Sequence, residues 1–191
     1  EKILIQDVPI LNYIYSKKKF NSIVLLNYSN ELYPFLEWCQ QLIAESLGKK
    51  GKGLLPVISK APKDHHSLLQ LYLDGPKDKF FTFIEKARDK SVTKLDCRYS
   101  KSKTFQDLHQ KSLEELLNAE MNATIRTISK KKIPIRRITL ESYNEKYIGS
   151  LMMFFFIETI FSCFLLEVNP FDQPAVEEGK KLTKRFLKYN E

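Results

Sequence analysis

The stretch SIVLLNYSNELYPFLEWCQQLIAESLG, residues 22–48, joins a short apolar run to a longer helical pattern. Residues 22–26 are rich in β-branched and aliphatic side chains, which is typical of a buried strand. Between residues 30 and 47 one apolar stripe recurs at helical spacing: Leu32, Phe35, Leu36, Cys39, Ile43 and Leu47. Gly48 is well suited to end that helix. The stretch therefore predicts a buried strand followed by a helix that packs on it.

The same alternation continues through the chain. Further strands are predicted at 54–58, 80–84 and 136–140, and further helices at 65–74, 105–129, 145–167 and 173–188, with a polar excursion at 85–104. This order predicts an α/β fold, a doubly wound and mostly parallel sheet covered by helices on both faces. Such sheets bind ligands at the carboxyl ends of their strands. We expect one domain over residues 1–191, with 141–191 as a C-terminal helical segment packing on it.

Composition indicates an ordered globular protein, with 43% hydrophobic and 28% charged residues in 191. The net charge of +8 favours anionic partners. The lysines and arginines are scattered in short runs, so we expect no nucleic-acid partner. Cys39, Cys97 and Cys163 lack a C-x-x-C spacing, which predicts reduced thiols in a cytoplasmic protein.

Residues 147–168, YIGSLMMFFFIETIFSCFLLEV, are apolar over the length of a membrane span. Glu158 lies in the middle of this segment, and three hydroxyl side chains dilute it. We therefore expect a buried helix of a globular domain and no membrane partner. The chain begins without Met and without a signal-peptide pattern, and we interpret it as a fragment or processed piece.

Glu45 is the first candidate for chemistry. On the predicted helix it shares a face with Trp38 and Gln41, away from the apolar stripe. The loop that follows, GKKGKG, has no bulky side chain to cover it. A carboxylate in this place could act as a general base. The pattern equally fits a solvated surface glutamate, and both interpretations stay open.

The stretch KDHHSLLQLYLDG, residues 63–75, places two histidines at a predicted helix start. Asp64 is the expected N-cap, so His65 and His66 fall in the first turn. Adjacent helical residues point about 100° apart, so the pair is poorly placed to bind one metal ion, and we expect no metal site. A histidine at a helix N-terminus stays neutral and could transfer protons. A purely structural polar start is the alternative.

The stretch NPFDQPAVEEGKKLTK, residues 169–184, predicts a turn followed by a helix. Asp172 or Gln173 is the expected cap, with Pro174 in the first turn. Gln173, Glu177 and Lys180 then share one face. Lys180 could be partly desolvated and functional at the edge of the apolar stripe, or it could be an ordinary surface lysine.

AESLGKKGKG, DHHSLLQLYLDGP and NPFDQPAVEEGK, in this order, resemble the glucose-6-phosphate isomerase family. The agreement runs from about Ile23 to the C-terminus. The resemblance implies the sugar-isomerase (SIS) fold. It also implies interconversion of glucose 6-phosphate and fructose 6-phosphate through a cis-enediol, without a cofactor, in glycolysis and gluconeogenesis.

Carried over by position, the resemblance assigns roles to four residues. Glu45 would be the base that moves a proton between C2 and C1 of the sugar phosphate. His66 would open the sugar ring and would come from the neighbouring subunit of a homodimer. Lys180 would be the other ring-opening group, and Gln173 a substrate contact. At the position of His65 family members more often carry Gln.

The sequence departs from the family in one respect. It has no Gly-Gly pair, and before Glu45 it lacks the Ser/Thr-rich phosphate-binding loop that accompanies the Gly-Gly-Arg motif. The chain thus resembles the C-terminal portion of such an enzyme, less than half of it, and we expect no appreciable turnover from it alone. The alternative is a non-catalytic SIS-type module that binds sugar phosphate.

Overall fold

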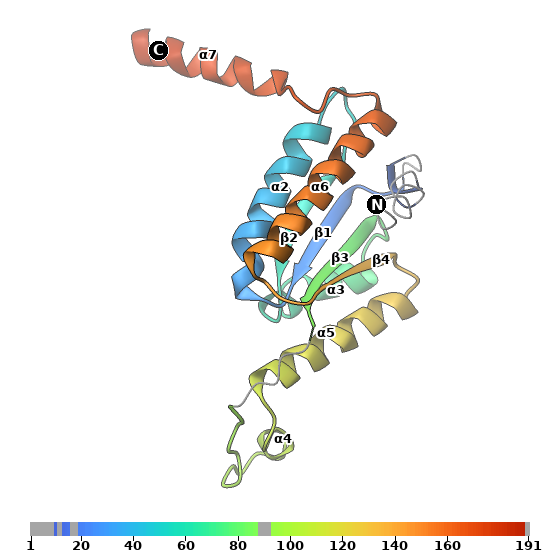
Figure 1. The fold of residues 1–191 in the computed structure, drawn as a ribbon, viewed down its shortest axis with the longest axis vertical. Coiled ribbons are helices and arrows are strands. Elements are labelled where there is room, and N and C mark those ends of the chain that lie inside the picture. Colours follow the sequence, from blue (N-terminus) through green and yellow to red (C-terminus); the bar gives the residue numbers. More distant parts are fainter. Residues whose placement is uncertain (1–9, 11–12, 16–18, 88–92, 190–191) are drawn as a thin grey trace.

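A computed structural model describes residues 10, 13–15, 19–87 and 93–189 of the chain. Its strands form one parallel sheet in the order β2-β1-β3-β4 (Figure 1). The strands are β1 (Ser22–Asn27), β2 (Leu55–Lys60), β3 (Lys79–Lys86) and β4 (Ile135–Leu140). All four lie where the sequence predicts them, within two residues at each end, so the predicted parallel α/β fold is confirmed.

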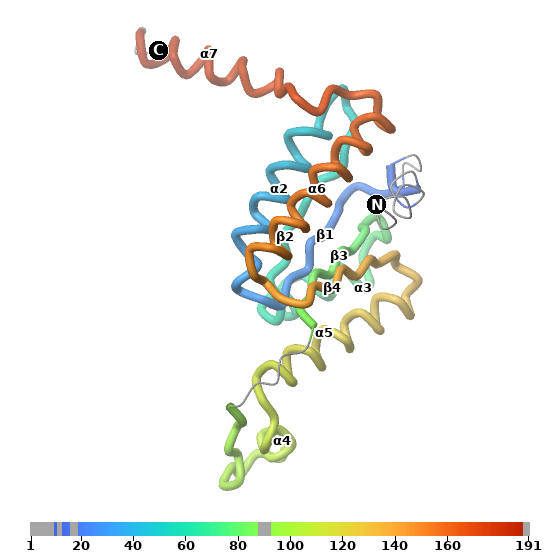
Figure 2. The backbone as a smooth tube through the Cα atoms, in the orientation of Figure 1, coloured from blue at the N-terminus to red at the C-terminus, as the bar shows by residue number. Residues whose placement is uncertain are grey.

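Helices cover both faces of this sheet. The helices of the described chain are α2 (Tyr33–Leu47), α3 (Leu69–Asp74), α4 (Lys103–Asp107), α5 (Leu113–Lys130), α6 (Glu145–Leu166) and α7 (Pro174–Tyr189), with 3₁₀ turns η1 (Asn30–Leu32) and η2 (Lys63–His65). Helices α2 and α6 run side by side over one face (Figure 2), and α3 and α5 pack on the other. The sheet is therefore doubly wound, and the direction of winding reverses between β1 and β3.

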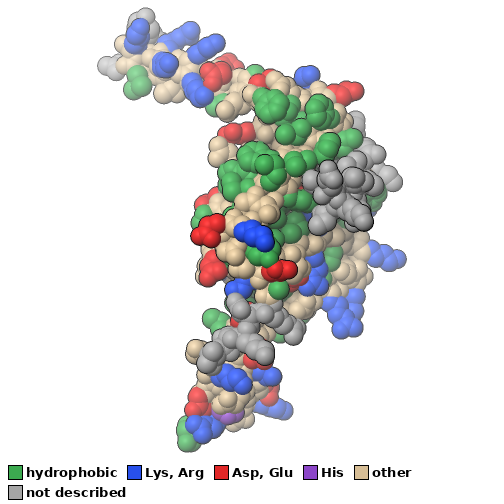
Figure 3. Space-filling model, in the orientation of Figure 1, with side chains coloured by type: hydrophobic (Ala, Val, Ile, Leu, Met, Phe, Trp, Pro, Cys, Tyr) green, Lys and Arg blue, Asp and Glu red, His purple; other side chains and the backbone are tan. Residues whose placement is uncertain are grey.

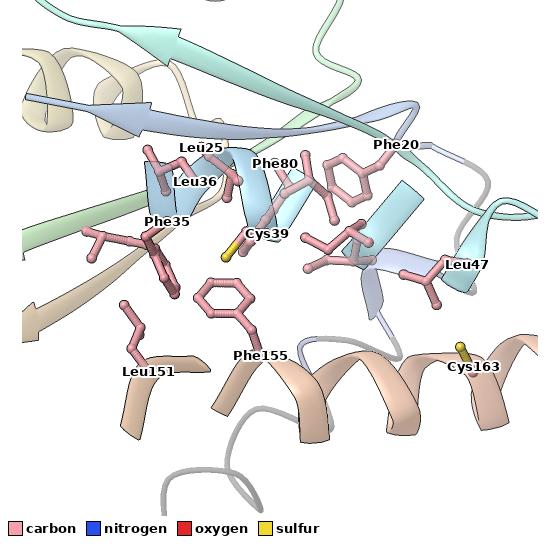
Figure 4. Close-up of a cluster of buried hydrophobic side chains, with 14 of the residues drawn as sticks. Phe20, Leu25, Phe35, Leu36, Cys39, Leu47, Phe80, Leu151, Phe155 and Cys163 are labelled. Atoms are coloured by element: carbon pink, nitrogen blue, oxygen red, sulfur yellow. The ribbon is translucent and has the colours of Figure 1, made fainter. Parts of the chain in front are cut away.

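The core divides into two clusters because alternate strand residues point to opposite faces. Ile23 and Leu25 of β1 face α2 and α6, whereas Val24 and Leu26 face α3 and α5. The predicted apolar stripe of α2 is buried over its whole length, from Leu32 to Leu47. Figure 4 shows this stripe meeting side chains of α6, with the Phe155 ring between the helix and the sheet.

Two predicted helices differ from the structure for identifiable reasons. The helix expected from residue 65 begins at Leu69, because the Asp64 carboxylate binds the end of β2 instead of capping the helix. It accepts from the Lys60 backbone N–H at 2.7 Å and from the Ser59 hydroxyl at 3.0 Å. The helix expected over 105–129 is divided, because Ser112 forms a capping box that starts α5.

Helix α6 is only partly the buried helix that the sequence predicts. It is long and apolar enough to cross a membrane, and one of its faces packs against α2. Apolar side chains on other parts of its surface are exposed (Figure 3): Met153, Phe161, Phe164 and Leu165. Helix α7 extends away from the sheet, with its described side chains exposed and lysines and arginines gathered on it (Figures 1 and 3).

Candidate active site

A pocket of about 620 Å³ lies beside Glu45, and we call it the Glu45 pocket. Helix α2 starts at the carboxyl edge of the sheet, and its 15 residues extend about 22 Å, so it ends at the amino edge. Helix α6 runs the same way and ends beside it (Figure 1). The pocket lies between residues 44–51 at the end of α2 and residues 168–176, which connect α6 to α7.

Glu45 presents its carboxylate on the exposed side of α2. Gln41 donates to Glu45 Oε1 at 3.2 Å, so the predicted shared face is confirmed for this pair. Trp38, the third residue expected on that face, packs its ring against Phe156 of α6, with centroids 5.0 Å apart. Glu45 is thus an accessible carboxylate with a neighbouring amide donor.

Lys49 is the residue that joins the two sides of the pocket, and the sequence reasoning missed it. Its side chain is 8% exposed and its ammonium lies 3.0 Å from Asp172 Oδ1. The same ammonium donates to the backbone carbonyl of Asn169. The hydrogen bond from Lys49 holds the pKa of the Asp172 carboxyl below its usual range. This ion pair fixes the segment before α7 against the end of α2.

Two further lysines of the same loop bind the end of α6. Lys52 donates to the Leu166 carbonyl at 2.6 Å, and Lys50 donates to the Glu167 carbonyl at 3.3 Å. The last carbonyls of a helix lack intrahelical partners and carry negative potential, so ammonium groups stabilise them. The Gly/Lys loop, which was expected only to leave Glu45 uncovered, therefore also holds the C-terminal end of α6 in place.

Gln173 lines the Glu45 pocket. Lys180 is not among the described residues that line it. Gln173 directly precedes Pro174, the first residue of α7, as predicted. Lys180 lies further along the helix, pairs with Glu177 at 2.7 Å, and has a side chain 57% exposed. Of the two interpretations left open for Lys180, the exposed surface lysine describes its side chain in this chain by itself.

His66 lies at the opposite edge of the sheet from Glu45. It follows η2, directly after the carboxyl end of β2, and its side chain is exposed. Because the length of α2 separates the two edges, the fold of one chain cannot bring His66 to Glu45. His65, its neighbour, is half-buried and lies 2.6 Å from the Tyr28 hydroxyl.

A second pocket, of about 440 Å³, occurs at the carboxyl edge. It lies at the ends of β1 and β3, where the winding of the sheet reverses and where ligands bind in many α/β proteins. The described residues around it do not include Glu45, His66, Gln173 or Lys180. Glu45 and Gln173 thus lie at the amino edge, whereas the fold class predicts a ligand at the carboxyl edge, where His66 lies.

Curated relatives carry a consistent description. The chain is 35% identical over 189 residues to the glucose-6-phosphate isomerase of Methanocaldococcus jannaschii, covering 94% of this chain and 44% of the relative. It is 38% identical over 176 residues to that of Campylobacter jejuni, covering 89% and 43%. The chain therefore spans about two fifths of the length of these relatives. No protein-family model matches it.

Solved structures agree with these relatives. A hypothetical protein from Thermus thermophilus superposes with a TM-score of 0.87 at 29% identity, covering 96% of this chain and 45% of that one. A glucose-6-phosphate isomerase from Chlamydia trachomatis has the same fold, with a TM-score of 0.66 at 22% identity, covering 88% and 35%. The chain is thus homologous to the glucose-6-phosphate isomerases and corresponds to a portion of such a protein.

Proposed function

We propose that this chain is the C-terminal portion of an aldose–ketose isomerase that interconverts glucose 6-phosphate and fructose 6-phosphate in the cytoplasm. The observation that carries the proposal is the Glu45 pocket, where an accessible carboxylate and the Gln173 amide meet in a chain homologous to such isomerases. The free thiols of Cys39, Cys97 and Cys163 are in keeping with a reducing compartment.

The chemistry requires a base beside the carbon that is deprotonated. Glu45 takes the proton from C2 of the open-chain aldose and returns it to C1, and a cis-enediol forms between the two steps. Gln173 binds a sugar hydroxyl from the other wall of the pocket. The Lys49–Asp172 pair supports this geometry because it fixes residues 169–172, and with them Gln173, against the helix that carries Glu45.

The remaining two groups require more than one chain. His66 opens the sugar ring from a second copy in a homodimer, because within one chain it lies at the far edge of the sheet from Glu45. Lys180 is the other ring-opening group. It reaches the sugar when α7, whose described side chains are exposed here, packs against the rest of the assembled enzyme.

The test is Glu45→Gln in the complete isomerase. The amide keeps the shape of the side chain but cannot accept the proton, so exchange of the C2 proton with solvent should fall by about 10²-fold or more. Binding of fructose 6-phosphate should remain. Glu37→Gln, an exposed glutamate of the same helix, is the matched control and should keep full activity. Unchanged exchange in Glu45→Gln would show that Glu45 is not the base. Binding of fructose 6-phosphate without catalysed exchange in either wild type or variant would instead identify a sugar-phosphate-binding module.

A further inference from the structure

Tyr28, His65 and Thr124 form a polar cluster at the carboxyl edge of the sheet. Tyr28 directly follows β1, His65 ends η2, and Thr124 lies in α5. The Tyr28 hydroxyl lies 2.6 Å from His65 Nε2 and donates to Thr124 Oγ1 at 2.9 Å. Thr124 Oγ1 is itself 3.3 Å from His65 Nε2. The cluster therefore ties the turn after β2 to the central strand and to a core helix.

The hydrogen bonds hold one edge of the His65 ring. The Tyr28 hydroxyl and Thr124 Oγ1 lie 2.6 and 3.3 Å from His65 Nε2, and both hydroxyls can donate or accept, so this nitrogen has hydrogen-bond partners in either tautomer. Burial raises the pKa of Tyr28 to about 12, and the hydroxyl stays protonated at neutral pH. His65 thus has a fixed ring orientation, held by two buried or half-buried partners.

This orientation of His65 determines the direction of His66. Successive side chains of a 3₁₀ turn point about 120° apart, so a ring held inward at residue 65 turns the next ring outward. His65 is half-buried and His66 is exposed, as this geometry requires. Asp64 holds the same turn from its other side, because its carboxylate binds the Lys60 backbone N–H and the Ser67 hydroxyl.

We infer that His65 is a positioning residue for His66, and that it holds the His66 imidazole toward the surface at which a second copy docks. The inference rests on the proposed function, which makes His66 the ring-opening group. Tyr28 and Thr124 act through His65 and do not touch the substrate. Placement to within about 1 Å matters, because a displacement of that size can lower a rate by about 10².

The test compares variants of the complete isomerase. In His65→Ala the bond to Tyr28 is lost, and kcat should fall by about 10- to 100-fold with KM little changed. His65→Gln keeps an amide that can donate or accept a hydrogen bond near the position of Nε2, and it should restore most of the loss. The third histidine, His109, lies between α4 and α5 on the segment that projects from the sheet, so His109→Ala is the control and should keep wild-type kcat (Figure 1).

Two further measurements test the inference, one of them even if His65→Ala fails to fold. If His65→Ala does not fold, Tyr28→Phe replaces it, since it removes only the hydroxyl, and it should lower kcat in the same way. Unchanged kcat in these variants, with turnover abolished in His66→Ala, would overturn the inference and leave the proposed function standing. If His66→Ala and Glu45→Gln both stay active, the proposed function fails. NMR spectra of the His66 imidazole test the positioning role directly. The His66 ring should become more mobile in His65→Ala if His65 holds it in place, and unchanged mobility would contradict that role.

Discussion

Lys49 connects the two walls of the Glu45 pocket, although it belongs to no recognisable sequence motif. The sequence shows only a lysine after a helix-ending glycine, which is common on protein surfaces. In the fold its ammonium is buried, because α6 ends beside α2 and brings the Asn169 carbonyl and the Asp172 carboxylate to it. Long-range contacts of this kind depend on tertiary packing, so sequence patterns cannot predict them.

Replacing Lys49 by Met should loosen the connection between α6 and α7. The variant keeps the apolar stem but loses the ammonium, and the loss of a charge-assisted hydrogen bond should lower the free energy of unfolding by about 1–2 kcal/mol. Urea denaturation measures the change, and hydrogen exchange should show faster exchange in residues 169–173. Lys181→Met, at an exposed position of α7, should change stability by less than about 0.5 kcal/mol.

The contribution of Lys49 should also depend on pH. The pKa of Asp172 is lowered in the folded chain by the hydrogen bond from Lys49, so the stabilisation is present above the unfolded pKa, near 4. It is lost as pH falls through the lower folded pKa. The stability difference between wild type and Lys49→Met should therefore shrink as pH falls below about 4. A difference that stayed constant to pH 2 would show that Asp172 plays no part.

At the scale of elements, strands were the most predictable part. Residues 22–26, 80–84 and 136–140 are short apolar or β-branched runs, and each lies within one observed strand. The α2 stripe was also predictable, because burial follows directly from helical spacing. The first residues of helices were harder to predict, because Asp64 and Ser112 are both residue types that commonly cap a helix N-terminus. Only Ser112 has a glutamate three residues later that completes a capping box.

The attachment of α6 to the sheet depends on a buried ion pair that the sequence did not reveal. Arg136 of β4 donates to Glu158 at 2.7 Å, and both side chains are 10% exposed or less. The Arg136 guanidinium also donates to Thr82 Oγ1 at 3.3 Å. Glu158, which argued against a membrane span in the sequence, is thus the partner of a strand arginine. The pair holds α6 over the sheet.

Removing one partner of this pair should be costly. Glu158→Ala leaves the Arg136 charge buried without its carboxylate, and the free energy of unfolding should fall by about 3–5 kcal/mol. Glu145→Ala, at the exposed start of the same helix, should cost less than about 1 kcal/mol. In the double variant Arg136→Met/Glu158→Met most of the stability should return, as chemical denaturation would show. A loss in Glu158→Ala no larger than in Glu145→Ala would contradict this role.

At the scale of the whole molecule, the proposed function gives the chain only part of an active site. Glu45 and Gln173 share a pocket, while His66 and Lys180 point elsewhere, and the family's Gly-Gly-Arg motif is absent from the sequence. Sequence resemblance could assign these residues because motifs are local in the chain. It could not show which of them one copy brings together, because that depends on the edge of the sheet at which each loop emerges.

The isolated 191-residue chain should therefore fold without appreciable turnover. The chain spans 44% of the Methanocaldococcus jannaschii relative, and under the proposed function we expect phosphate anchoring and stabilisation of the enediolate to need residues outside the matched region. A coupled assay with fructose 6-phosphate measures turnover, and circular dichroism confirms that the sample is folded. Robust isomerase activity of the purified chain would contradict the assignment of a partial site.

The most direct test of the central claim, that Glu45 acts with the His66 of another copy, is to mix two inactive variants. Glu45→Gln and His66→Ala are co-expressed as complete isomerases. In a two-fold dimer with shared sites, a mixed dimer holds one intact site out of two. About half of the co-expressed dimers are mixed, so total activity should return to about a quarter of wild type. The pair Glu45→Gln with Glu45→Ala should remain inactive. No recovery in purified mixed dimers would contradict the claim that the two residues meet across the interface.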